Sequence, residues 1–128
     1  MIKQQFDVDG YWKVVVYYSL DYDFFDDVAF ELRKIDFPEA AIEEVYDMMS
    51  SDKAKGVTCS MIPSHASIVL FNSHSSEADY INTIVHESTH VMQSMLKAYD
   101  VEDKGEAPAY TIGYLVMKMY DVFKKIIY

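Results

Sequence analysis

The chain has 128 residues, of which 51% are hydrophobic, so it can bury the core of one ordinary domain, and this composition excludes a disordered chain. Acidic residues outnumber basic ones by 21 to 11, and the net charge of -10 disfavours binding to nucleic acid or to an anionic membrane. The single cysteine, Cys59, excludes an internal disulfide and a zinc site built from several thiolates. We therefore expect one acidic domain over residues 1–128.

The N-terminal half predicts a hairpin followed by two helices. An alternating apolar pattern with an Asp9-Gly10 turn signal predicts a β-hairpin over the first 18 residues, and its second strand is apolar on both faces. Apolar residues at helical spacing then predict helices over residues 23–35 and 38–50. The many acidic residues on these two helices are interpreted as solvated outer faces.

The C-terminal half predicts two short strands and two long helices. The strands cover residues 57–62 and 66–72, and both are expected near a sheet edge because Pro63, between them, cannot donate to a ladder. A long helix follows up to a break at residues 100–105, and a last helix covers residues 106–128. This order of elements predicts an α+β fold with a small antiparallel or mixed sheet.

One motif carries most of the chemical information: His86-Glu87-Ser88-Thr89-His90, in the middle of the first long helix. Residues four apart lie on one face of a helix, so the two imidazoles can reach one metal ion. Glu87 is rotated away from them, so that its carboxylate reaches a water molecule beside the ion. A motif of this type is expected by chance only about 0.01 times in a chain of this composition. The motif therefore predicts a zinc site with His86 and His90 as ligands and Glu87 as general base.

A catalytic zinc site needs a third protein ligand, and the sequence offers three routes to one. A third histidine six residues after His90 is absent, because a leucine stands there. Cys59 or His74 would supply the second route, although the residues around the cysteine do not match the pattern of peptide deformylases. The third route is Glu106, which is the best placed acidic residue at the start of the last helix. The alternative is that Glu106 binds no metal and only complements the helix dipole, as acidic residues in the first turn do.

Glu106 can bind the metal only if the chain after the motif helix returns toward His90. A motif helix that continued to Tyr99 would end about 13 Å beyond His90, and a direct return would leave Glu106 short of the metal. We therefore expect the motif helix to end early and the chain to return in an extended conformation.

Through this motif and Gly105-Glu106-Ala107-Pro108-Ala109-Tyr110, the sequence resembles the gluzincins, zinc metallopeptidases that follow HExxH with a glutamate on the next helix. It looks most like their smallest members and the short zincin-like proteins of bacterial and phage genomes. The resemblance covers residues 86–115 well and the upstream sheet only loosely. It implies a minimal zincin-like fold in which the sheet packs against the active-site helix and the following glutamate helix.

Carried over residue by residue, the resemblance makes His86, His90 and Glu106 the Zn2+ ligands and Glu87 the general base. Larger gluzincins often place an acidic residue one turn after the ligand glutamate, whereas this chain has Tyr110, which is expected to orient a ligand or to stabilise an oxyanion. The other candidates for a hydrogen-bond donor to an oxyanion are Tyr114, His65 and His74. In zincins an edge strand pairs with an extended peptide, a role expected here for residues 66–71.

The leading hypothesis is a cytoplasmic zinc metallopeptidase acting on a peptide or protein substrate, without a nucleic-acid or membrane partner. The cytoplasmic location is expected because the first residues lack the pattern of a signal peptide and no apolar run reaches about 20 residues. A hypothesis from another class is a zincin-fold binding or structural protein, such as a phage or mobile-element accessory, that holds zinc without turnover. A protein partner or a homo-oligomer is compatible with either hypothesis.

Overall fold

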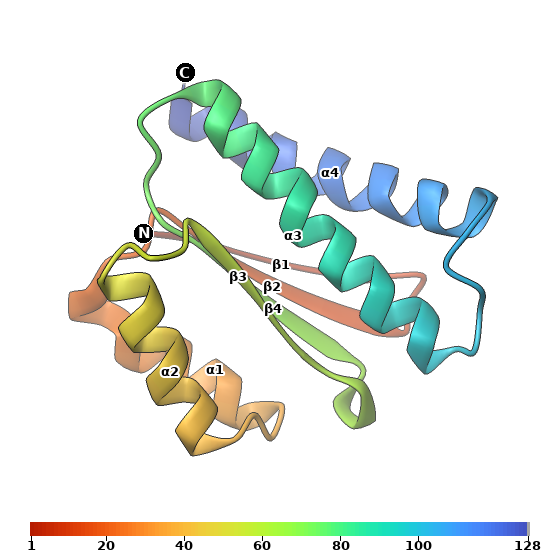
Figure 1. Cartoon of the computed structure of the whole chain (residues 1–128), viewed down its shortest axis with the longest axis horizontal. Coiled ribbons are helices and arrows are strands. Elements are labelled where there is room, and N and C mark those ends of the chain that lie inside the picture. The colour runs from red at the N-terminus through yellow and green to blue at the C-terminus, as the bar shows by residue number, and fades with distance from the viewer. Residues whose placement is uncertain (128) are drawn as a thin grey trace.

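The computed structural model describes residues 1–127 and has an α+β fold in three layers, with a four-stranded sheet between two pairs of helices (Figure 1). The predicted fold class is therefore confirmed. Short 3-10 turns at Tyr22–Phe24 and Ile62–Ser64 precede α1 and join β3 to β4. Within the described residues the longer elements are, in chain order, β1 Ile2–Val8, β2 Trp12–Tyr18, α1 Phe25–Lys34, α2 Glu39–Ser50, β3 Gly56–Met61, β4 Ala66–Phe71, α3 Glu77–Ala98 and α4 Glu106–Ile127.

The predicted hairpin forms the first two strands. Asp9 and Gly10 take φ values of 53° and 72°, the positive angles that a tight hairpin turn requires. The backbone N–H of Tyr11 donates to the carbonyl of Val8 at 3.1 Å and closes the turn. The local Asp-Gly signal thus determines the register of β1 against β2.

Both faces of β2 are covered, as its apolar pattern predicts. Val14 and Val16 belong to a core between the sheet and the α3–α4 pair. Val15 and Tyr17, which point the other way, belong to a second core against α1 and α2. The central strands are therefore buried on both sides, whereas each helix pair leaves one face in solvent.

The strand order β1-β2-β4-β3 corrects one expectation about the sheet. Strand β4, over residues 66–71, lies inside the sheet, parallel to β2 and antiparallel to β3, and all of its residues are buried. The edge strand on this side of the sheet is β3 instead, and β1 forms the other edge. The expectation that both strands lie near an edge of the sheet is confirmed, whereas the expectation that residues 66–71 form the edge strand itself is wrong. Pro63 lies in the 3-10 turn between the strands, where its missing N–H constrains neither ladder.

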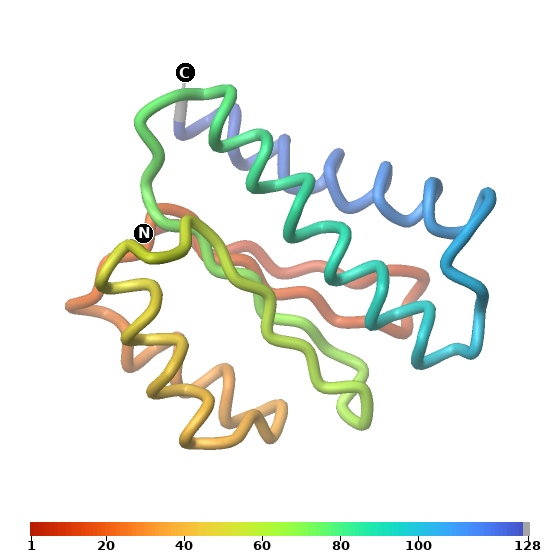
Figure 2. Tube along the Cα trace, viewed as in Figure 1, coloured from red at the N-terminus to blue at the C-terminus, as the bar shows by residue number. Residues whose placement is uncertain are grey.

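Helix α3 does not end early, so this expectation is also wrong. The Ser76 side chain caps its start by accepting from the N–H of Asp79, and the helix continues to Ala98. It continues because the apolar residues after the motif, including Val91 and Met95, stay buried in the α3–α4 core. Helix α4 then returns antiparallel, and its C-terminal end lies beside the start of α3 (Figure 2).

No helix in residues 1–127 has both the length and the apolar character needed to cross a bilayer.

A buried carboxylate links the edge strand β1 to α1. Glu31 is only 5% exposed and accepts from Lys3 at 2.9 Å and from Lys34 at 3.3 Å. Burial acts to raise the pKa of Glu31, but the two lysine hydrogen bonds outweigh it and hold the pKa below the ordinary value of 4.5. The stabilisation is therefore complete above that ordinary value and is lost as the pH falls through the lower, folded value.

We predict that Glu31→Gln lowers the free energy of unfolding at pH 7 by about 1–3 kcal/mol, because two lysines lose their buried acceptor charge. Urea unfolding from pH 3 to pH 7 should also show a weaker loss of stability in acid than the wild type shows. Glu39→Gln is the control, because the pair of Glu39 with Arg33 is exposed and its loss should leave stability nearly unchanged. Equal effects of the two substitutions would contradict this account.

Candidate metal centre

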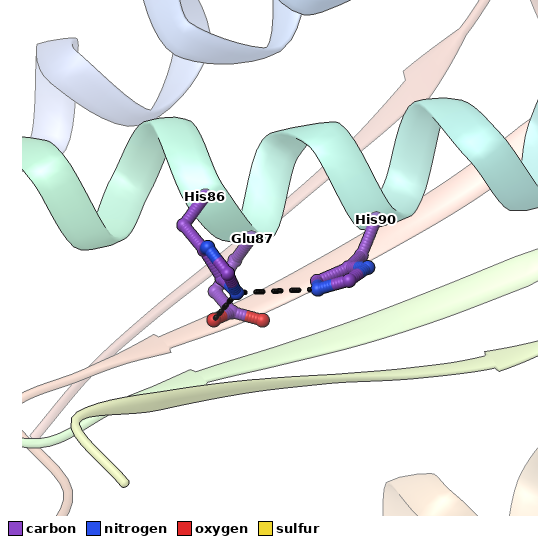
Figure 3. A group of neighbouring side chains, drawn as sticks. All are labelled: His86, Glu87 and His90. Atoms are coloured by element: carbon purple, nitrogen blue, oxygen red, sulfur yellow. Dashed lines mark hydrogen bonds and ion pairs between the residues drawn. The ribbon is translucent and has the colours of Figure 1, made fainter. Parts of the chain in front are cut away.

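The motif side chains project from α3 toward the strands (Figure 3). Their side chains differ in exposure: that of His86 is 65% exposed and that of Glu87 only 6%. This contrast follows from helix geometry, since Glu87 lies one residue, or about 100°, further round the helix than His86. The histidines therefore face open space while the carboxylate points toward β3.

The two histidines converge on one point. Their Nε2 atoms are 3.2 Å apart. Two imidazole nitrogens bound to one tetrahedral zinc ion, each at 2.0–2.1 Å, would be separated by about 3.3 Å. The Nδ1 atom of His90 also contacts Oε1 of Gln93 at 3.3 Å, a contact that restrains the ring and leaves Nε2 directed at the shared point. The spacing of the two nitrogens thus matches that of two imidazole ligands on one zinc ion.

Strand β3 holds the Glu87 carboxylate in place. The hydroxyl of Thr58 lies 3.0 Å from Oε1 of Glu87 and 3.2 Å from its backbone carbonyl, so it can donate to either. Gly56 makes the approach of the strand close: a Cβ at this position would lie 3.1 Å from Cγ of Glu87 and 2.7 Å from Cγ2 of Thr83. The strand can cross α3 at this distance only because residue 56 has no side chain.

The motif opens into a cleft of about 530 Å³ between α3, the edge strand β3 and the α1–α2 pair. One side of the cleft is polar and carries the motif, and the other is apolar. The lining residues are Phe37, Met48, Ala54, Gly56, Val57, Thr58, Ser60, His86, Glu87, His90, Gln93 and Ser94. The cleft is thus large enough to admit several residues of a bound chain beside the two histidines.

The predicted ligand Glu106 lies away from this site. Among the described residues, the ligand atoms within 4.8 Å of one another belong to His86, Glu87 and His90. The Ser88 hydroxyl contacts the Met119 sulfur at 3.6 Å, which places the level of the motif near Met119 on α4. Glu106 is thirteen residues earlier, about 20 Å along the helix axis. Glu106 lies this far from the motif because α3 is long and places the turn between α3 and α4 far past His90.

Tyr110, predicted to act at the cleft, is 80% exposed on α4 and is not among the residues that line the cleft. Tyr114 is also on α4 and donates to the Asp7 carbonyl at 3.3 Å, near the β1–β2 turn. Both tyrosines lie away from the motif because α4 covers the β1 half of the sheet, whereas α3 covers the β3 half. The structure therefore does not bring these tyrosines to the motif.

The remaining candidates also have other partners. His74 contacts the Asn72 carbonyl at 2.7 Å and the Thr83 hydroxyl at 2.8 Å, and burial lowers its pKa. His65 stacks on Trp12 at a centroid distance of 5.8 Å. Cys59 is buried in the core on the α1–α2 side of the sheet, the face opposite the motif. The upstream route to a third ligand is thus not supported by this arrangement.

No family model, curated protein or solved structure matches the chain.

Sequence reasoning did not single out Gly56 or Thr58, which fix the position of Glu87. One signal was present, because a glycine within a strand indicates a close approach by another element. The identity of that element depends on β3 being the edge strand over α3, which local sequence does not determine.

We predict that Gly56→Ala lowers the free energy of unfolding by about 1–3 kcal/mol, because the new methyl group overlaps Thr83, whose branched side chain has little rotamer freedom. The matched control is Gly113→Ala in α4, where a Cβ meets nothing within 4 Å. In a helix interior that change should stabilise the fold by about 0.5–1 kcal/mol. Thermal unfolding at low micromolar concentration measures both, and a Gly56→Ala protein as stable as the wild type would contradict the close contact.

We predict that Cys59 does not react with a thiol reagent such as DTNB at pH 8 in the folded protein. Burial, with a smaller contribution from the charge of Glu87, raises the pKa of the Cys59 thiol to about 12, and the thiolate is the reactive form. One equivalent should react after unfolding in guanidinium. Equally fast reaction in the folded and unfolded states would place Cys59 at the surface instead.

Proposed function

We propose that the chain is a zinc-dependent peptidase whose centre is formed by His86, His90 and Glu87. The observation that carries the proposal is the pair of Nε2 atoms 3.2 Å apart at the wall of an open cleft, beside a buried carboxylate. Paired imidazoles with oxygen donors suit zinc among the common divalent ions. When bound, zinc polarises a carbonyl group and makes an adjacent water molecule more acidic.

Glu87 supplies the proton transfers in this proposal. Its carboxylate accepts a proton from the attacking water and returns it to the leaving amine, a role that requires a fixed position close to both groups. Thr58 supplies that fixation from the neighbouring strand, with its hydroxyl 3.0 Å from Oε1. Because the carboxylate is almost fully buried, it has little freedom to turn away from the histidines.

The edge strand β3 suits an extended peptide. Its outer edge has no strand partner within the described sheet, so its backbone groups are available for strand addition. Side chains of an extended peptide point alternately to the two faces of a sheet. One set would face the motif, and the other would face the apolar wall of Phe37, Met48 and Val57. We therefore propose substrates with apolar side chains at every second position.

A second candidate function is zinc binding without turnover, and the position of Glu106 favours it. Glu106 lies about 20 Å away along α4. Among the described residues, the ionisable groups that lie close enough together to bind one ion are those of His86, Glu87 and His90. If Glu87 itself binds the ion, no base is left at the cleft. The two functions therefore assign different roles to the same carboxylate.

Glu87→Gln separates these roles. For a peptidase, we predict that the variant keeps its zinc affinity and loses activity on a peptide mixture by about 100-fold or more, because the general base is gone. Isothermal titration calorimetry with zinc and mass spectrometry of the peptide products measure the two effects. Loss of zinc by Glu87→Gln would instead identify the carboxylate as a ligand and support zinc binding without turnover.

Two controls bracket this experiment. His90→Ala should weaken zinc binding by at least about 100-fold, because it removes one of two converging ligands. Glu106→Gln should leave zinc affinity unchanged, because its side chain is exposed at the far end of α4. A wild-type protein that binds no zinc would contradict both candidate functions.

A further inference from the structure

Helix α4 carries apolar residues on two opposite faces. The inner face, with Leu115, Met119 and Phe123, is completely buried against the sheet and α3. The outer face is in solvent, yet Tyr110 is 80% exposed and Met117 55% exposed on it. A helix that is apolar on both sides is normally covered on both sides. The outer face of α4 therefore has the character of a contact surface.

The outer face of α4 differs in charge from the outer faces of α1 and α2. Residues 107–117 contain no charged residue, although the chain as a whole has a net charge of -10. The outer faces of α1 and α2 instead carry exposed acids such as Asp26 and Glu43. A second copy of this acidic chain would meet less repulsion at the outer face of α4 than at those of α1 and α2.

Six exposed positions on one face of α4 follow the spacing of a coiled-coil seam. They alternate in steps of four and three residues, as the a and d positions of a heptad do. We call this set the outer seam, and its members are Glu106, Tyr110, Gly113, Met117, Tyr120 and Lys124, all of them exposed.

We propose that the outer seam binds the outer seam of a second copy of this chain, antiparallel and about a twofold axis level with residue 115. In such a pair the numbers of two facing residues add up to 230, so that Gly113 faces Met117 of the second copy. The two tyrosines then meet each other, and Glu106 at one end meets Lys124 at the other. The seam is thus complementary to itself in charge as well as in apolar character, which an isologous dimer requires.

Gly113 supplies the matching shape at the centre of the pair. A hollow of about 410 Å³ lies on this face and is lined by Ala109, Tyr110, Gly113, Tyr114 and Met117. A glycine within a helix costs about 0.5–1 kcal/mol relative to alanine. The space that its missing side chain leaves is filled by nothing in the described chain. In the antiparallel pair, Met117 of the second copy enters this hollow above Gly113.

The dimer is expected to be weak. The seam is about 27 Å long at 1.5 Å per residue, and one helix pair of that length buries less area than a standard stable interface. We therefore expect a monomer–dimer equilibrium in the micromolar to millimolar range. None of the seam residues lines the motif cleft, so the proposal does not rest on the function proposed for that cleft.

Sedimentation equilibrium between about 10 µM and 1 mM tests the proposal. The wild type should shift from a mass of 14.8 kDa toward twice that value as concentration rises. Met117→Lys should remain monomeric throughout, because it places a charge in the hollow. Tyr11→Lys is the matched control, since Tyr11 is 72% exposed on the β1–β2 turn, and it should dimerise like the wild type. A wild type that stays monomeric at 1 mM, or equal effects of the two lysine variants, would overturn the proposal.

Charge reversal tests the antiparallel register. Glu106→Lys and Lys124→Glu should each weaken the dimer by about threefold or more, because each creates two repulsive pairs. The double variant should restore wild-type affinity within about twofold. Lys124 also contacts Asp121 in its own helix at 3.3 Å, but this exposed pair is not restored by the double reversal. Failure of the double variant to recover affinity would overturn the proposed pairing, and far-UV circular dichroism checks that each variant is folded.

Discussion

The close crossing of β3 over α3 is the constraint on which the candidate site depends. Gly56 allows the strand to approach the helix, and Thr58, two residues later on the same face, then reaches the Glu87 carboxylate. With Glu87 held against the strand, helix geometry turns His86 and His90 toward the cleft, where their Nε2 atoms converge. The strand therefore positions the carboxylate, and the helix positions the two imidazoles relative to it.

Local signals in the sequence predict most of the fold. The Asp9-Gly10 turn, the apolar pattern of the second strand and the helical periodicities all describe contacts between near neighbours, and the structure confirms the elements that they predict. The order of strands was not predictable in the same way, because it depends on which strand pairs with β2 across the sheet. The six buried residues of β4 are the pattern of an internal strand, whereas Pro63 beside it indicates only a position near an edge.

The candidate site was predictable where its geometry is local and not where it is tertiary. Four residues of helix determine the relation between His86 and His90, so the motif alone predicts that they share a face. The expected ligand Glu106 depended on where α3 ends, and that end is fixed by the packing of residues such as Val91 and Met95 against α4. Thr58 was missed for the same reason, because its partnership with Glu87 spans 29 positions in sequence.

The two long helices have different tasks in this account. Helix α3 has its inner side in the core and its motif side at the cleft, so the polar residues of the motif face the cleft. Helix α4 packs against α3 through contacts such as Ser88 with Met119, and its outer face carries the seam that we propose binds a second copy. The antiparallel pairing of α3 with α4 separates the cleft from the seam, so occupation of one surface leaves the other open.

The most direct test of the central claim, that His86 and His90 together hold one metal ion, is X-ray absorption spectroscopy of the zinc-loaded protein. The account predicts two histidine nitrogens at about 2.0–2.1 Å, with oxygen donors completing the coordination. No sulfur is expected, because Cys59 is buried on the opposite face of the sheet. A sulfur neighbour at about 2.3 Å, or a zinc ion bound by oxygen alone, would contradict it.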